Sequence, residues 1–124
     1  MKKTRKAEFD LEERTARFGE EIIKFVKLTH KNPITIPLIS QLVRAGTSVG
    51  ANYCEANNAQ SKREFVYKIS TCKKETKETQ YWLRIVTKAL PNMKASAQPL
   101  NQESQELLLI FSAILSSCSK SKKV

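Results

Sequence analysis

Residues 61–90 read SKREFVYKISTCKKETKETQYWLRIVTKAL, and this stretch decides the fold class. Apolar or small side chains recur at alternating intervals of four and three residues, which predicts one buried stripe along a single helix. Ser61 followed by Glu64 predicts a capping box at its start, and Pro91 predicts its end. A helix of about thirty residues would be about 45 Å long, so it must run the full length of a helical bundle. The stripe consists of Phe65, Ile69, Cys72, Thr76, Thr79, Leu83, Val86 and Leu90.

Two more helices are predicted before this one. The first runs from about Leu11 to His30 and ends before Pro33, because proline disfavours helical geometry in the residue that precedes it. The second begins at Thr35 or Pro37 and runs to about Asn58, since proline is tolerated in a first helical turn. Their apolar stripes are Phe18, Ile22, Phe25 and Thr29 in the first, and Leu38, Leu42, Ala45, Val49, Asn52 and Ala56 in the second.

Gly46 and Gly50 stand four residues apart inside the second predicted helix. Each costs the helix about 1 kcal/mol relative to alanine, so their presence needs a reason. We interpret the pair as a place where a neighbouring helix approaches the backbone closely. A phosphate-binding loop of the Walker type is excluded, because no strand precedes the glycines and no Gly-Lys-Ser/Thr follows them.

Residues 91–100 are rich in Pro, Asn, Ser and Ala and predict a loop. A fourth helix then runs from about Asn101 to Ser119. The short connections predict an all-α fold, an antiparallel up-down-up-down four-helix bundle over residues 11–119. Residues 1–10 and 120–124 are predicted to be basic tails. The apolar residues of the fourth helix are Leu107, Leu108, Ile110, Phe111, Ile114 and Leu115.

The chain of 124 residues carries 22 basic and 12 acidic side chains, a net charge of +10, and this excess is local. Seven of the basic residues lie in the two tails, which leaves residues 7–119 with a net charge of only +3. Within that body, residues 62–94 hold nine basic and three acidic groups, a net charge of +6. Basic tails bind phosphate backbones or simply maintain solubility, so the segment at 62–94 is the more informative feature.

We expect a cytoplasmic protein with no membrane partner. The first residues are basic but are not followed by the apolar region of a secretory signal. The longest apolar run, Leu107 to Phe111, is too short to span a bilayer. The three cysteines, Cys54, Cys72 and Cys118, are odd in number and widely spaced, which favours reduced structural thiols over a disulfide framework.

The central sequence resembles a known bacterial family. The resemblance rests on QLVRAGTSVGAN at residues 41–52, on Glu55-Ala56, on Ala59-x-Ser61-Lys62, on Phe65, Lys68 and Ile69, and on KETKETQYWL at residues 74–83. These motifs resemble the four-helix-bundle family that includes the intervening-sequence proteins, which are encoded inside insertions in large-subunit ribosomal RNA genes. The resemblance covers about residues 9–119. Departures are mild: Ala45 stands where Ser is more frequent, and Cys72 and Thr76 stand where Ala is usual.

This resemblance implies a four-helix bundle that assembles into a homo-oligomer, typically a ring of five, with a poorly defined biochemical role. The resemblance extends to a relative in the same fold group, an accessory protein in retroelement-driven sequence diversification that binds nucleic acid and a reverse transcriptase. The resemblance therefore implies self-association, with RNA, DNA or a protein as further partners.

Polar residues on the second and third helices predict a hydrogen-bonded network between them. Their spacings of three and four residues place them on one stripe of each helix. Such a layer can fix helix register or form a subunit contact, and a ligand or partner site is the functional alternative. The network residues are Arg44, Ser48, Asn52, Glu55, Glu75 and Glu78.

We predict no enzyme activity, no cofactor and no metal site. A di-iron bundle would need inward carboxylates with two Glu-x-x-His pairs, and this chain has a single histidine, His30, and no such pair. Structural zinc needs clustered Cys and His, and a Ser or Cys nucleophile needs a nearby base. We interpret His30 as an exposed residue at a helix end.

The nucleic-acid candidates on the third helix are Lys62, Arg63, Lys68, Lys73, Lys74, Lys77, Arg84 and Lys88. Lys73, Lys77, Arg84 and Lys88 share one face, whereas Lys62, Arg63 and Lys74 point elsewhere. The leading hypothesis is a non-enzymatic, homo-oligomeric four-helix bundle, a pentamer as the resemblance implies, that binds nucleic acid or a nucleoprotein through this helix and the tails. An ordinary solvated face is the competing interpretation, and a protein-protein scaffold with incidental positive charge is the alternative function. Tyr81 and Trp82 either stack on bases or pack at an interface.

Overall fold

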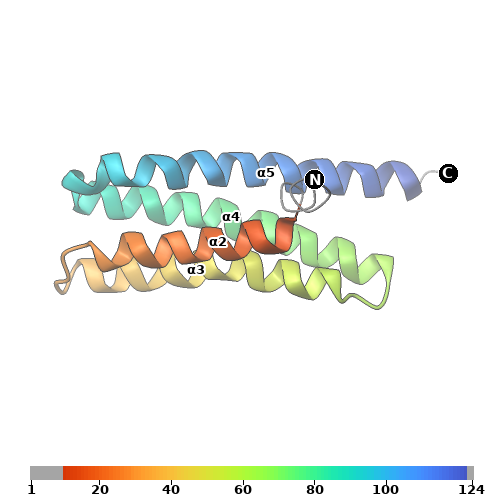
Figure 1. Cartoon of the computed structure of the whole chain (residues 1–124), viewed down its shortest axis with the longest axis horizontal. Helices are drawn as coiled ribbons and strands as arrows, with labels where there is room; N and C mark the ends of the chain where they lie inside the picture. The colour runs from red at the N-terminus through yellow and green to blue at the C-terminus, as the bar shows by residue number, and fades with distance from the viewer. Residues whose placement is uncertain (1–9, 123–124) are drawn as a thin grey trace, which may run out of the picture.

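The computed structural model describes residues 10–122, which fold as an antiparallel up-down-up-down four-helix bundle (Figure 1). The elements are α2 (Leu11–Lys27), α3 (Thr35–Asn57), α4 (Lys62–Ala89), the short 3-10 helix η1 (Pro91–Met93) and α5 (Lys94–Lys122). The predicted fold class is confirmed. The basic tail predicted at residues 1–10 lies outside the described residues apart from Asp10. α5 continues to Lys122 and therefore includes the first three residues of the tail predicted at 120–124.

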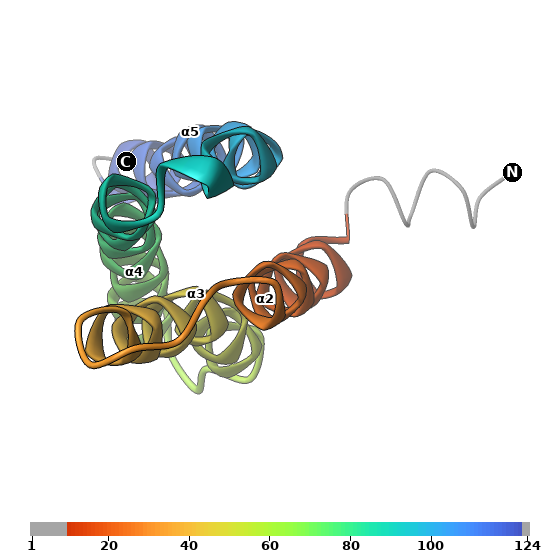
Figure 2. The same ribbon diagram turned by 90° about the vertical axis from the view of Figure 1, so that its left-hand side faces the viewer.

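The helices follow one another around the bundle in chain order, so that α3 packs on α2, α4 on α3 and α5 on α4. The closing edge between α2 and α5 is the least closely packed, and Figure 2 shows these two helices standing apart at the end facing the viewer. The α2–α3 turn and the α4–η1–α5 turn lie at the same end of the molecule, and the α3–α4 turn lies at the other (Figure 1).

The helix starts are fixed by side-chain caps. Asp10 accepts a hydrogen bond from the backbone N–H of Glu13 at 3.2 Å, and Ser61 accepts one from Glu64 at 3.1 Å. The Glu64 carboxylate accepts in return from the N–H of Gln60 at 2.9 Å, one residue before the position expected for a capping box. Both caps satisfy helix-end donors that have no intrahelical partner.

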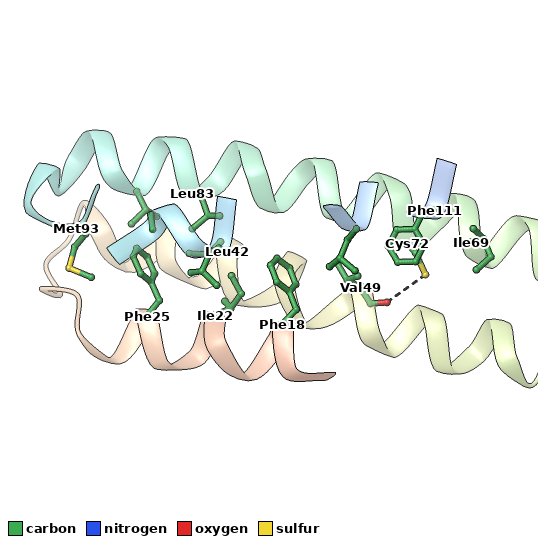
Figure 3. Packing of buried hydrophobic residues seen from close by; sticks show 14 of the residues in the cluster. Phe18, Ile22, Phe25, Leu42, Val49, Ile69, Cys72, Leu83, Met93 and Phe111 are labelled. Atoms are coloured by element: carbon green, nitrogen blue, oxygen red, sulfur yellow. Dashed lines mark hydrogen bonds between the residues drawn. The ribbon is translucent and has the colours of Figure 1, made fainter. Parts of the chain in front are cut away.

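The predicted apolar stripes form the core. Phe18, Ile22 and Phe25 of α2 are at most 4% exposed, and Figure 3 shows them in a row beside Leu42 and Leu83. Threonines fill other positions of the α4 stripe because their hydroxyls donate to the preceding turn, as Thr76 does to the Cys72 carbonyl at 2.8 Å. The Cys72 thiol lies 3.5 Å from the Val49 carbonyl (Figure 3), and burial raises its pKa to about 12.

The loop predicted at residues 91–100 is wrong. η1 and the first turns of α5 occupy these residues, and α5 contains Pro99. A proline inside a helix costs about 3 kcal/mol relative to alanine. Burial on the opposite side of the helix offsets that cost. The buried stripe begins before the proline and follows the same four-three spacing as the stripe of α4, and Pro99 itself is exposed. The buried stripe is Met93, Ala97, Leu100, Ser104, Leu107 and Phe111.

The glycine interpretation is confirmed. A β-carbon added at Gly50 would stand 3.2 Å from the backbone carbonyl carbon of Thr15, and one at Gly46 would stand 2.8 Å from the Cγ1 atom of Ile22. Both contacts lie between α2 and α3. Gly19 differs, since its nearest atom would be the Cα of Thr47 at 3.6 Å, an ordinary van der Waals contact.

We therefore expect Gly46→Ala to lower the free energy of unfolding by about 1–3 kcal/mol, because the new methyl group must displace the fully buried Ile22 side chain. Gly19→Ala is the matched control. It should raise the free energy of unfolding by up to about 1 kcal/mol, because it gains helix propensity without a clash. Urea unfolding of both variants followed by circular dichroism measures the difference, and equal effects would contradict the close α2–α3 approach.

Candidate nucleic-acid interface on α4

The basic side chains predicted on one face of α4 reach solvent from the middle of the helix to its C-terminal end. Lys77, Arg84 and Lys88 are exposed, and Lys73 is half-buried. Within the described residues, none of the four lies within ion-pair distance of a carboxylate. From Lys73 to Lys88 the helix rises about 22 Å, at about 1.5 Å per residue. Their charges therefore face water along a continuous stretch of the helix.

The end of this face is hollowed. A surface hollow of about 620 Å³ is lined by Arg84, Lys88 and Lys94, together with Ile85, Thr87 and Pro91. No Asp or Glu occurs in the sequence from residue 79 to residue 102, so the last turns of α4 and the first turns of α5 bring no acidic side chain to the three cations. A concave surface with several like charges concentrates anions more strongly than a flat one.

Lys94 is the functional candidate that sequence reasoning missed. The loop predicted at residues 91–100 contains it, whereas in the structure it begins α5 and lies beside the last turns of α4. The signal in the sequence that locates it is the four-three spacing of Met93, Ala97, Leu100, Ser104, Leu107 and Phe111, which predicts a helix that begins near Lys94.

Lys62 and Arg63 are not brought together with the other candidates. They are exposed in the first turn of α4, at the opposite end of the bundle from Lys88 (Figure 1). Lys68 is also different, since its ammonium group lies 2.6 Å from the Glu55 carboxylate. The predicted candidates thus divide into a row along α4 that runs to the α4–α5 corner, two exposed residues in the first turn of α4, and Lys68, which is paired with Glu55.

Arg44, Glu75 and Glu78 form the network predicted between the second and third helices. The guanidinium of Arg44 on α3 lies 3.3 Å from Glu75 and also bonds Glu78, both on α4. The indole N–H of Trp82 donates to Glu78 at 3.3 Å. Desolvation raises the pKa of Glu78, but the hydrogen bonds from Trp82 and Arg44 outweigh it, so the pKa is lowered.

Ser48, Asn52 and Glu55 do not join this network. The Ser48 hydroxyl donates to the Arg44 carbonyl at 2.6 Å, and the Asn52 amide donates to the Ser48 carbonyl at 2.9 Å. Glu55 pairs with Lys68 instead. The structure thus contains a compact cluster around Arg44, with separate local contacts along α3.

The two aromatic residues of α4 have different surroundings. Trp82 packs against the core, whereas Tyr81 is 54% exposed. Their rings meet edge to face, with centroids 4.9 Å apart. Tyr81 is therefore the one whose ring is open to a partner.

The described residues contain no group of three or more His, Cys, Asp or Glu side chains that could hold a metal ion. His30 is exposed after the end of α2. Within the same residues, no helix combines the length and apolar content that crossing a bilayer requires. The absence of enzyme activity stays a prediction.

A family model described as 23S rRNA-intervening sequence protein matches residues 7–113, which is most of the chain. The chain belongs to the 23S rRNA-intervening sequence protein family. A crystal structure of a protein with unknown function from the S23 ribosomal protein family of Bacteroides thetaiotaomicron is similar to it, with a TM-score of 0.76 and 28% sequence identity. The match covers 84% of this chain and 96% of that one. A comparison with curated proteins gave no match.

In this intervening-sequence protein, we expect Arg44→Gln to lower the free energy of unfolding by about 1–2 kcal/mol, a value discounted for the partial exposure of Arg44. The change leaves the Glu75 carboxylate, whose side chain is 10% exposed, without its ion-pair partner. Arg17→Gln is the matched control, because it breaks the Arg17–Glu13 pair, whose side chains are both more than half exposed. The control should lose less than about 0.5 kcal/mol in the same urea titration. Similar losses in both variants would show that the network does not stabilise the fold.

Proposed function

We propose that this chain is a non-enzymatic, homo-oligomeric protein that binds nucleic acid through the outer face of α4 and the start of α5. One observation carries the proposal: Arg84, Lys88 and Lys94 line a hollow of about 620 Å³. Lys73 and Lys77 continue the charged surface along α4. Arg and Lys side chains without acidic neighbours attract a polyanion and release its bound counterions, which makes binding salt-dependent and largely independent of sequence.

Structured RNA is the first ligand to test. The family name refers to 23S rRNA intervening sequences, and that name supports an RNA partner for this chain. Tyr81, which is exposed on α4, offers a ring on which an unpaired base can stack. Duplex DNA is the second ligand, because phosphate contacts alone do not distinguish the two.

We expect the triple variant Arg84→Gln/Lys88→Gln/Lys94→Gln to bind structured RNA at least about tenfold more weakly at about 50 mM salt, with a shallower dependence of affinity on salt. The reason is the loss of about three phosphate contacts. Fluorescence anisotropy at two salt concentrations measures both quantities. The control variant, Arg17→Gln/Lys24→Gln/Lys27→Gln, removes the same charge from α2, and it should retain the affinity and most of the salt slope. Equal losses of RNA affinity in both triple variants would show that binding depends on the net charge of the protein and not on the surface formed by α4 and α5.

Self-association is part of the proposal. Tyr67 and Leu109 are large side chains more than half exposed on the flanks of the bundle, and such side chains are suited to a subunit contact. The family resemblance implies a ring of five, which would repeat the α4 surface in every subunit and so increase avidity for a long polyanion.

Light scattering coupled to size-exclusion chromatography is expected to give a mass near five times the 14.1 kDa of the chain. The exposed apolar flanks are the physical reason, since they leave water on assembly. Leu109→Glu, which places a charge on an exposed position of α5, should shift the mass toward the monomer if that flank is in the contact. A monomeric mass for the unaltered chain at micromolar concentration would contradict this part of the proposal.

A protein scaffold is the second candidate function, and the α2–α5 groove favours it. This groove of about 630 Å³ has Phe18, Phe25 and Leu100 on its floor. Its rim charges pair among themselves, as in the contact of Arg14 with Glu103 at 2.7 Å. A partner that docks there would keep its affinity in the Arg84→Gln/Lys88→Gln/Lys94→Gln variant, whereas nucleic acid would not.

A further inference from the structure

The α2–α3 turn displays three large aliphatic side chains to solvent. Leu28 is 72% exposed, Ile34 70% and Ile36 54%. Turns at the surface are normally built from Gly, Pro, Asn, Asp and Ser, so three aliphatic residues within nine positions at the end of a bundle are unusual. We call this region the α2–α3 tip and define it as Lys24, Lys27, Leu28, Lys31, Ile34 and Ile36.

The turn is held in place from within. The Lys31 ammonium donates to the carbonyls of Val26 and Thr29 at 2.6 and 2.7 Å. The Asn32 side chain accepts from the backbone N–H groups of Ile34 and Thr35 at 2.8 and 2.9 Å. The Thr35 side chain is buried and its hydroxyl donates to the His30 carbonyl at 2.7 Å. These bonds fix the backbone so that the aliphatic side chains stay outside the core.

The charged side chains of the tip itself are all basic, while Glu21 and Glu103 line the α2–α5 groove together with Lys24 and Leu28. The sequence contains no Asp or Glu from residue 22 to residue 54, while Lys24, Lys27 and Lys31 lie within the tip. The nearest acid along the chain is Glu21, whose carboxylate lies 3.5 Å from Lys24. The α4–η1–α5 turn lies at the same end of the molecule (Figure 1). It falls within residues 79–102, which also contain no Asp or Glu.

From these observations we propose that the α2–α3 tip docks on the surface of an anionic lipid bilayer. Leu28, Ile34 and Ile36 enter the headgroup region, and Lys24 and Lys27 contact lipid phosphates. A bilayer interface supplies both an apolar layer and diffuse negative charge, and it adapts to a protruding turn without a matching pocket. Nucleic acid supplies the charge but has no apolar layer to receive three aliphatic side chains.

This contact is peripheral and reversible. No helix in the described part of the chain is suited to crossing a bilayer, so the protein would lie on the surface and not span it. The expectation of no membrane partner was based on the absence of an apolar span, which does not test a contact of this kind. The inference does not depend on nucleic-acid binding, because it uses residues of α2 and α3 and not the α4–α5 corner.

Vesicle co-sedimentation tests the proposal with the full chain. We expect binding at about 50 mM salt to vesicles of phosphatidylcholine containing about one-third phosphatidylserine, and little binding to phosphatidylcholine alone. Leu28→Ser/Ile34→Ser/Ile36→Ser should lower the partition coefficient at least about tenfold, because it removes the inserting side chains. Ile23→Ser is the control, since Ile23 is an aliphatic residue of α2 that is 37% exposed but lies outside the tip, and it should bind as the unaltered chain does.

Three results would overturn the proposal. The first is no binding to phosphatidylserine vesicles at low salt, as expected if the tip instead engages an acidic protein. The second is full binding by the Ser variant, which would make the contact one of charge alone. The third is a parallel loss of RNA affinity in the Ser variant, which would assign the tip to the nucleic-acid surface. Circular dichroism checks that the variants fold, and a chain that binds vesicles but no RNA would refute only the proposed function.

Discussion

The continuous buried stripe of α4 is the constraint on which the rest of the structure depends. Six of its eight positions, from Ile69 to Val86, are buried. The two helices next to it in the bundle, α3 and α5, both pack along α4, so the length of α4 determines the length over which they can be buried. Because one side of α4 is used for the core over the whole length of the bundle, its basic residues have only the opposite side available. The surface proposed to bind phosphate is thus a direct consequence of how the core is built.

The distribution of acidic residues explains why the positive charge matters more than its net value suggests. Acidic side chains are absent from residues 22–54 and 79–102, and several of the others are already paired. Arg14, for example, bonds both Glu103 and Glu106, and these bonds raise the pKa of its guanidinium despite partial desolvation. Lys27, Lys88 and Lys94, which have no ion-pair partner among the described residues, belong to the end of the bundle that carries the α2–α3 and α4–η1–α5 turns (Figure 1).

Much of the fold could be predicted because local signals and burial agree. The four-three stripes of the first three helices and the Ser61 cap each indicate the same helices that form. The prediction failed where one residue opposed a pattern that extends over many residues. Pro99 indicates a loop, whereas Met93, Ala97 and Leu100 are the first members of the buried stripe that continues along α5. Tertiary burial prevailed over the local preference of one residue. The same error concealed Lys94, whose place beside Arg84 and Lys88 depends on where α5 begins.

The polar residues show a second limit of sequence reasoning, because spacing identifies a shared face but not a partner. Arg44, Ser48, Asn52 and Glu55 follow one stripe of α3, yet only Arg44 reaches Glu75 and Glu78. Ser48 and Asn52 are short enough to bond the carbonyls of their own helix, and Glu55 is next to Lys68 across the α3–α4 interface. The cluster around Arg44 joins the two helices that also carry the glycine contacts and the basic face. Its polar groups are satisfied by one another, which favours a role in holding α3 and α4 in register over one in binding a ligand.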